Sequence, residues 1–277
     1  MYTLEELNRV TEQLSHLPEE NDISLKLYCE YYDYYIRNCT YIIEFLDGKS
    51  LTIQIKAGSI AHIMDIHAFY DNTIKDKKLK YSGAFSNVDA YKNMKNSIIT
   101  LDTLKKSKHG REWKKNTIRD RVLGFPFIRN AILKGEWYKF DINKFNGETK
   151  VIPEYIATIK IGKTYFNFCF EKESDIYYCL SDIVVYKSNS RVKNQELLNI
   201  ERITEIKNGT INRVVCRSKH MEKCFKSRKN VNVSTINCAT HQKIYRQSKS
   251  FNSNMIEENA YTIEYLKIDN FISKKIR

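Results

Sequence analysis

Residues 154–186 read EYIATIKIGKTYFNFCFEKESDIYYCLSDIVVY, and this stretch decides the fold class. Three runs rich in apolar, β-branched and aromatic residues cover about 154–160, 164–170 and 176–186. Ile161-Gly162-Lys163 is short enough for a tight connection, and Lys172 to Asp175 form a polar turn. Each run is therefore expected to pair with the next, which predicts an antiparallel β-meander.

Helical patterns come before this meander. Helices are predicted over about 3–16, 22–38, 59–70 and 117–134, with weaker periodicity at 91–104 and a further helix at 193–206. Pro126 is expected to bend the helix at 117–134. Strands 41–46 and 51–55 are predicted to form a hairpin about Asp47-Gly48, and 137–142 a further strand. Helices followed by strands indicate an α+β fold.

The chain divides in sequence near Asn208-Gly209. Residues 1–209 are expected to form one α+β domain, whose first 40 residues are a helical lead-in. Residues 210–277 are expected to be a small basic C-terminal extension, because the apolar pattern weakens there.

Charge is distributed unevenly over the 277 residues, whose formal net charge is +13. Ten acidic and three basic residues give 1–48 a net charge of −7, whereas 49–250 carry +20. Within the latter, 216–250 hold nine basic residues and one acidic residue. This segregation favours an anionic partner, RNA or another nucleic acid first, although a solvated basic loop gives the same pattern.

Several classes are not supported by the sequence. No run approaches the roughly 20 apolar residues of a membrane helix, and the N-terminus lacks the pattern of a signal peptide. The seven cysteines are odd in number and several lie in apolar runs, which is typical of a reduced, cytoplasmic protein. Nucleotide-binding P-loop, Rossmann and α/β-hydrolase motifs are absent from the sequence.

Residues 61–67 read AHIMDIH and offer two candidate acid–base groups. Imidazole titrates near neutrality, so either His62 or His67 could transfer a proton. On a continuous helix, residues five apart lie roughly 140° apart, so the two rings are not expected to bind one metal. A structural role for His62 among its apolar neighbours is the alternative.

Arg119 and Arg121 lie on the helix predicted at 117–134. Since they are two residues apart, they point to different helix faces, and one of them could hold a phosphate by bidentate contact. The alternative is an ordinary solvated helix start.

The basic segment offers candidate nucleic-acid contacts with interspersed aromatic residues. They are Lys219, Lys223, Lys226, Arg228, Lys229, Lys243 and Arg246. Cys216, His220, Cys224, Cys238 and His241 could be read as metal ligands. Their spacing is looser than that of zinc fingers, so neither a metal site nor a cofactor is expected.

Four short motifs, taken in order, resemble the phage-type branch of the barnase–EndoU–colicin–RelE-like nucleases, specifically the subgroup with a Phe-x-His-Leu-x-Gly-Leu motif. The matching residues are 62–67, 118–122, 152–155 and Ser181. Ile60 replaces the motif's Phe, and Asp65 replaces its Gly. The resemblance covers about 20–206 and implies a helical start, an antiparallel sheet and metal-independent RNase activity in conflict between mobile elements.

Two interpretations remain open. In the first, the chain is a phage or mobile-element endoribonuclease that needs no metal, with His62 as acid or base, Arg121 as phosphate clamp, and Tyr155 and Ser181 as hydrogen-bond donors. His67 is the alternative to His62, and Arg119 is the alternative to Arg121. In the second, it is a non-catalytic protein that blocks a host or defence nucleoprotein. A DNA-binding role of 210–250 is weaker, since no helix-turn-helix is evident.

Overall fold

The computed structural model describes residues 1–69, 87–107 and 110–217. The chain divides into two compact units. Of the described residues, unit 1 holds those within Met1–Arg37 and Ile53–Leu198, and unit 2 holds Asn38–Thr52 and 199–217. Within the described ranges, no helix is long and apolar enough to cross a membrane.

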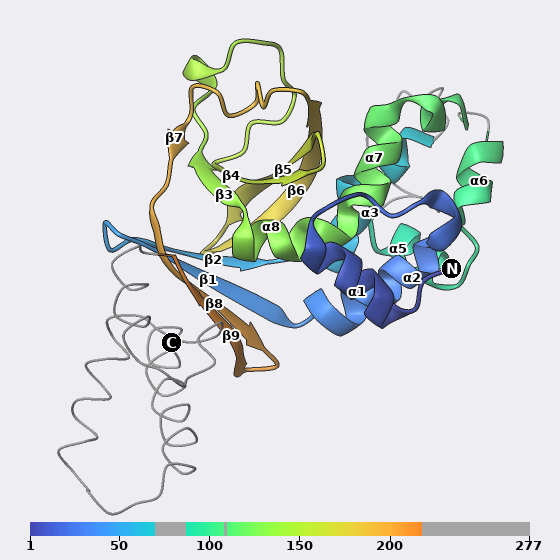
Figure 1. Ribbon diagram of the computed structural model, residues 1–277, viewed down its shortest axis with the longest axis horizontal. Coiled ribbons are helices and arrows are strands. Elements are labelled where there is room, and N and C mark those ends of the chain that lie inside the picture. Colours follow the sequence, from blue (N-terminus) through green and yellow to red (C-terminus); the bar gives the residue numbers. More distant parts are fainter. Residues whose placement is uncertain (70–86, 108–109, 218–277) are drawn as a thin grey trace, which may run out of the picture. The chain divides into compact units, whose positions relative to one another are not determined.

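The described α-helices of unit 1 all lie between Leu4 and Lys134, before the meander in the sequence, and are coloured blue to green in Figure 1. They are α1 (Leu4–Gln13), α2 (Leu25–Tyr31), α3 (Ile60–Ile63), α5 (Asn87–Lys95), α6 (Leu101–Lys106), α7 (Asn116–Gly124) and α8 (Ile128–Lys134). A capping box starts α1, because Thr3 accepts from the Glu6 amide while the Glu6 carboxylate accepts from the Thr3 amide. The helical start predicted from the sequence is therefore confirmed.

Five strands of unit 1 contain the meander. They are β3 (Glu136–Lys139), β4 (Tyr155–Ile161), β5 (Thr164–Glu173), β6 (Ile176–Tyr186) and β7 (Glu196–Leu197), hydrogen-bonded in the order β7-β3-β4-β5-β6. All of these pairs are antiparallel. The end of β2 (Ser50–Gln54) pairs with β6 in parallel, through Ile53 and Gln54. The sheet is therefore mixed, which the sequence did not predict.

One face of β4, β5 and β6 is packed against α7. Ala157, Phe168 and Asp182 lie opposite one another in the register, so their side chains share a face. Phe166 shares it because it lies two residues from Phe168 on the same strand. A Cβ added to Gly124, at the end of α7, would lie 2.1 Å from the Phe166 ring, so the glycine permits this close approach.

The opposite face carries a second apolar cluster. Cys169 and Ile156 pack there with Phe140 and Val192, and all four side chains are buried. Ser181 lies opposite Cys169 in the register and so shares this face. Two neighbouring residues of β6 therefore point into different surroundings. Asp182 lies on the face packed against α7, and Ser181 lies on the face that carries Cys169.

Two helical predictions need comment. The helix predicted at 117–134 is interrupted by a 3-10 turn at Phe125–Phe127, which contains Pro126, and this confirms the expected bend. The helix predicted at 193–206 is wrong, because 200–207 form a strand paired on both sides. The i, i+3 spacing of Ile203 and Ile206 gave the helical pattern, but strand pairing determines the conformation.

Unit 2 is built on hairpins. Its strands are β1 (Cys39–Phe45), the start of β2, β8 (Ile200–Lys207) and β9 (Thr210–Cys216), in the order β2-β1-β8-β9. Asn208-Gly209 forms the turn between β8 and β9, with φ of 51° and 80°. Positive φ at both positions is what a two-residue hairpin turn requires, and Asn-Gly supplies it at low cost.

Candidate functional site

The two histidines of 61–67 lie together because the helix that carries them is interrupted. α3 ends at Ile63, and Asp65 adopts φ 58°, a left-handed conformation. The chain then continues as a 3-10 turn over Ile66–Phe69. As a result the ring centroids of His62 and His67 are 4.9 Å apart, instead of lying on different faces of one helix as expected.

Asp65 connects this turn to α7. Its Oδ1 lies 3.1 Å from His67 Nε2, and its Oδ2 accepts a hydrogen bond from Arg121 Nη1 at 2.7 Å. The side chains of His67, Arg121 and Asp65 are 28%, 21% and 17% exposed, so solvent reaches each of them. The structure therefore brings His67 and Arg121 onto one carboxylate, with His62 against the His67 ring.

A second carboxylate, that of Asp182, interacts electrostatically with Arg121 from the sheet. The Asp182 side chain is fully buried on the face of β6 that packs against α7. Burial raises the pKa of Asp182 to about 7, and Arg121 is the charged side chain that opposes this shift. The backbone amides of Asn167 and Ile183 also oppose it, although no hydrogen bond of standard geometry reaches either carboxylate oxygen from the described residues.

These five residues, His62, Asp65, His67, Arg121 and Asp182, are called the Arg121 cluster below. Arg121 Nε is also buried without a hydrogen-bond partner in the described part of the chain. Buried donors and acceptors are normally satisfied, so the unsatisfied groups of Arg121 and Asp182 call for an explanation. The cluster combines two imidazoles, a guanidinium and two carboxylates, which suits proton transfer beside a bound anion.

Other predicted site residues lie elsewhere in unit 1. Arg119 contacts Asp120, with Nε and Nη2 each 3.2 Å from Oδ1, and Tyr186 donates to the other oxygen of Asp120 at 2.9 Å. Tyr155 lies edge-on to Tyr177, with ring centroids 5.3 Å apart. None of these contacts involves a residue of the Arg121 cluster.

Ser181 lies next to Asp182 in sequence but on the other face of the sheet. Its hydroxyl makes only a long contact, 3.5 Å, to the Asp182 carbonyl oxygen. The alternation of side chains along β6 thus directs Asp182, and not Ser181, towards α7. Asp182 was not predicted as a site residue, although an acidic residue inside the apolar run 176–186 was a visible signal.

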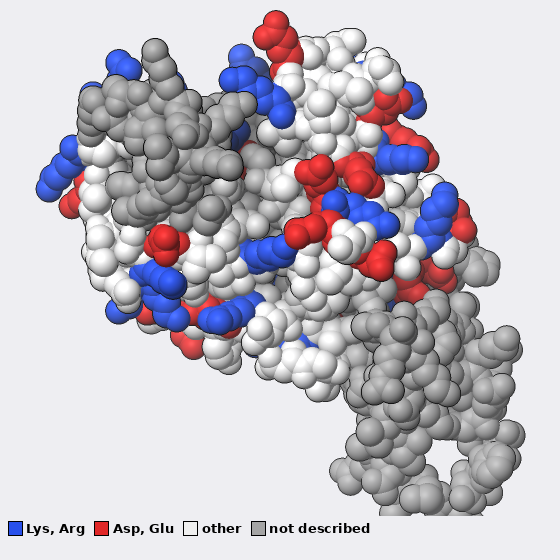
Figure 2. All heavy atoms as spheres, turned by 180° about the vertical axis from the view of Figure 1, so that it is seen from behind, with Lys and Arg blue, Asp and Glu red and all other residues white. Residues whose placement is uncertain are grey.

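The acidic N-terminal segment is paired within the fold. Glu12 forms ion pairs with Arg129 and Lys134, and Glu20 forms one with Lys105 at 2.5 Å. Within unit 2, Glu44 pairs with Arg202. The segregation of charge along the sequence is therefore in part complementarity between segments of the fold, and Figure 2 shows Lys and Arg interspersed with Asp and Glu over the described surface in view.

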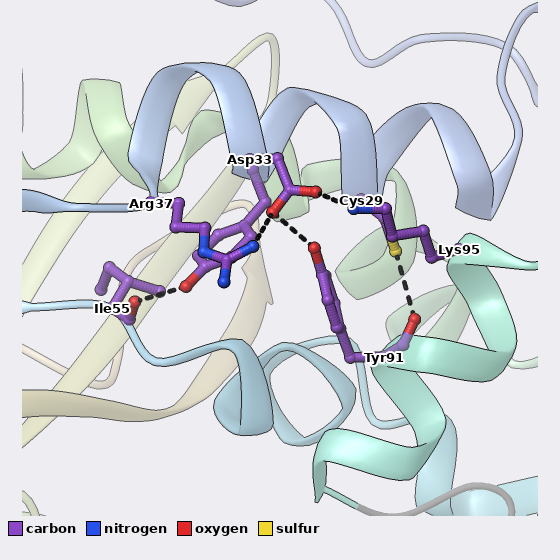
Figure 3. A network of polar contacts seen from close by, with 7 residues as sticks. Cys29, Asp33, Arg37, Ile55, Tyr91 and Lys95 are labelled. Atoms are coloured by element: carbon purple, nitrogen blue, oxygen red, sulfur yellow. Dashed lines mark hydrogen bonds and ion pairs between the residues drawn. The ribbon is translucent and has the colours of Figure 1, made fainter.

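Asp33 is the centre of a further polar network, in a π-helical turn over Tyr32–Ile36 that follows α2 (Figure 3). Tyr91 and Lys95 of α5 donate to its two oxygens at 2.5 Å each, and Arg37 donates at 3.1 Å. Burial would raise the pKa of Asp33, but these hydrogen bonds outweigh burial and lower it. The network joins α2 to α5 and has the character of a structural contact.

The basic segment lies outside the described residues, apart from its first positions. This applies to all seven predicted lysine and arginine contacts from Lys219 to Arg246, and to His220, Cys224, Cys238 and His241. Cys216 is the last residue of β9 and is half-buried. Over the described ranges, no group of three or more His, Cys, Asp or Glu is arranged to hold a metal ion.

Comparisons with protein-family models, with curated proteins and with solved structures find no match to this chain.

Proposed function

We propose that the chain is an RNase-like protein of a phage or mobile element, which cleaves RNA at the Arg121 cluster without a metal ion. The observation that carries the proposal is the approach of the His62 and His67 rings, 4.9 Å between centroids, beside a guanidinium held by Asp65. Cleavage through the ribose 2′-hydroxyl needs a base, an acid and a cation on the phosphate, and the cluster holds one group for each role.

In this reaction His62 removes the 2′-hydroxyl proton, and the 2′-oxygen forms a bond to phosphorus. The bond from phosphorus to the 5′-oxygen breaks, and that oxygen receives a proton from His67 in its imidazolium form. The products are a 2′,3′-cyclic phosphate and a 5′-hydroxyl. Arg121 contacts the non-bridging oxygens, where negative charge develops. Asp65 stabilises the protonated form of His67 through the 3.1 Å contact.

A second candidate function is binding without cleavage, in which the chain blocks a host or defence nucleoprotein. It is favoured by the ion pair between Arg121 and Asp65, which compensates the charge that a phosphate clamp would use. In that case the cluster would tie α7 to the turn after α3 and take no part in chemistry.

The two candidates predict different results for end-labelled RNA incubated with a chelator. The nuclease cleaves it, and the variants His62→Ala and Arg121→Gln lose the activity. Matched controls are His16→Ala, an exposed histidine, and Arg111→Gln, whose side chain is 80% exposed; both are expected to cleave as the wild type does. Absence of cleavage, together with salt-dependent binding of the intact RNA, would instead support the second candidate.

A further inference from the structure

Asp182 is a fully buried carboxylate of unit 1 that the proposed reaction does not use. Its side chain has no exposed surface, and it lies on β6 opposite Phe168, on the face packed against α7. A fully buried carboxylate without a good hydrogen bond is expensive to keep ionised. Packing alone does not explain why a carboxylate is buried here, where it interacts electrostatically with Arg121.

Arg121 is the cationic side chain that interacts electrostatically with Asp182. Cys169 of β5 and Cys179 of β6 lie near enough to interact with it electrostatically, and burial raises the pKa of both thiols, so both are neutral near pH 7. From α3 and the turn after it come His62, Asp65 and His67. Asp65 already accepts from Arg121 Nη1, whereas Arg121 Nε is buried and unsatisfied.

We propose that Asp182 is a positioning residue of the Arg121 cluster, which attracts the guanidinium electrostatically from the sheet side and competes for it with the phosphodiester of the substrate. This inference rests on the proposed function, because the ligand is the phosphate of that reaction. The protonation state of Asp182 then determines whether Arg121 is available to bind the phosphate. Arg121 and Asp65 together are neutral, so an ionised Asp182 makes this group of three net negative, and a protonated Asp182 makes it neutral.

Competition of this kind gives the site a pH dependence near neutrality. Because burial raises the pKa of Asp182 to about 7, protonation on the acid side of this value removes the competing charge. An anion then binds better as the pH falls. His62 and His67 also gain charge as the pH falls, so the contribution of Asp182 has to be measured as the difference that Asp182→Asn makes.

The test uses the full chain and a thymidine dinucleotide, whose single phosphodiester keeps one negative charge at every pH used and cannot be cleaved through a 2′-hydroxyl. Its dissociation constant is measured by calorimetry at ~pH 6 and ~pH 8. Asp182→Asn is expected to bind about tenfold more tightly than the wild type at the higher pH and about equally at the lower pH. Glu205→Gln, which alters a fully buried carboxylate of unit 2, is the control and is expected to match the wild type.

An unchanged or weaker affinity of Asp182→Asn at the higher pH would overturn the proposal. Should that variant fail to fold, the 13C resonance of the Asp182 carboxyl in the wild type decides instead. Addition of the dinucleotide is expected to raise its titration midpoint, and an unmoved midpoint overturns the proposal. If the dinucleotide results are as expected but RNA is not cleaved, the proposed RNase activity is refuted. The conclusion that Asp182 controls anion binding by Arg121 then still holds.

Discussion

Arg121 Nη1 lies 2.7 Å from Asp65 Oδ2, and this hydrogen bond joins α7 to the turn after α3. The same carboxylate contacts His67 Nε2 at 3.1 Å, so one side chain orients both the guanidinium and an imidazole. Asp65 holds this place at φ 58°, which Asp and Asn tolerate better than most residues.

Replacement of Asp65 by Asn is predicted to separate these roles. Asn accepts the left-handed backbone, but it loses both charged contacts, so the free energy of unfolding is expected to fall by about 1.5–3 kcal/mol. Denaturant unfolding monitored by circular dichroism measures the change. Asp47→Asn is the control, since its pair with Lys49 is exposed, and a loss equal to that control would contradict the role of Asp65.

Asp182 is predicted to make stability depend on pH. Its carboxyl has a pKa of about 7 when folded and close to 4 when unfolded, so the folded state holds the proton more tightly. Its contribution is therefore fully present in acid and is lost as the pH rises from ~4 to ~7, by about 4 kcal/mol in total. At ~pH 8, Asp182→Asn is expected to be more stable than the wild type. Parallel pH–stability curves for the two proteins would refute this prediction.

Gly124→Ala is predicted to disturb the packing of α7 on β5. The added Cβ would lie 2.1 Å from Phe166 Cε1, so the ring or the helix must shift, at a cost of about 1–3 kcal/mol. The melting temperature measures this loss. Thr117→Ala, at an exposed position of the same helix, is expected to stay within about 0.5 kcal/mol of the wild type. Equal melting temperatures of the two variants would show that α7 does not approach β5 this closely.

Asp33→Asn is predicted to weaken the contact between α2 and α5. The variant keeps the shape of the side chain but loses charged hydrogen bonds from Lys95 and Arg37, and about 1–2 kcal/mol is expected after allowance for solvent. The lowered pKa of Asp33 sets the sign of the pH dependence. Its contribution is present above the unfolded pKa of ~4 and is lost as the pH falls through the lower folded value. A variant as stable as the wild type at neutral pH would contradict this account; Asp89→Asn, at an exposed pair, is the control.

The meander could be read from the sequence because alternation, β-branched residues and turn residues agree over 154–186, and β4, β5 and β6 lie where they were predicted. The strand at 200–207 could not, because Ile203 and Ile206 also satisfy helical spacing and only pairing with β1 and β9 selects the strand. The parallel contact between β2 and β6 joins segments more than 120 residues apart, which no local pattern encodes.

The candidate site was predicted in part. His62 and Arg121 were chosen for their chemistry, and the structure places Arg121 beside the histidine pair. Asp65 was noted only as a replacement for glycine, since its left-handed backbone, which interrupts the helix, is not visible as a pattern. Ser181 was predicted as a site residue and Asp182 was not, yet Asp182 is the one on the face packed against α7, because the face to which each residue of β6 points depends on the register.

The end groups of RNA fragments, determined by mass spectrometry after incubation with the full chain and a chelator, test the central claim most directly. The account predicts fragments that end in 2′,3′-cyclic phosphate, and a rate at least about 100-fold lower for His62→Ala than for the control His16→Ala. Intact RNA, or equal rates for these two variants, would contradict it.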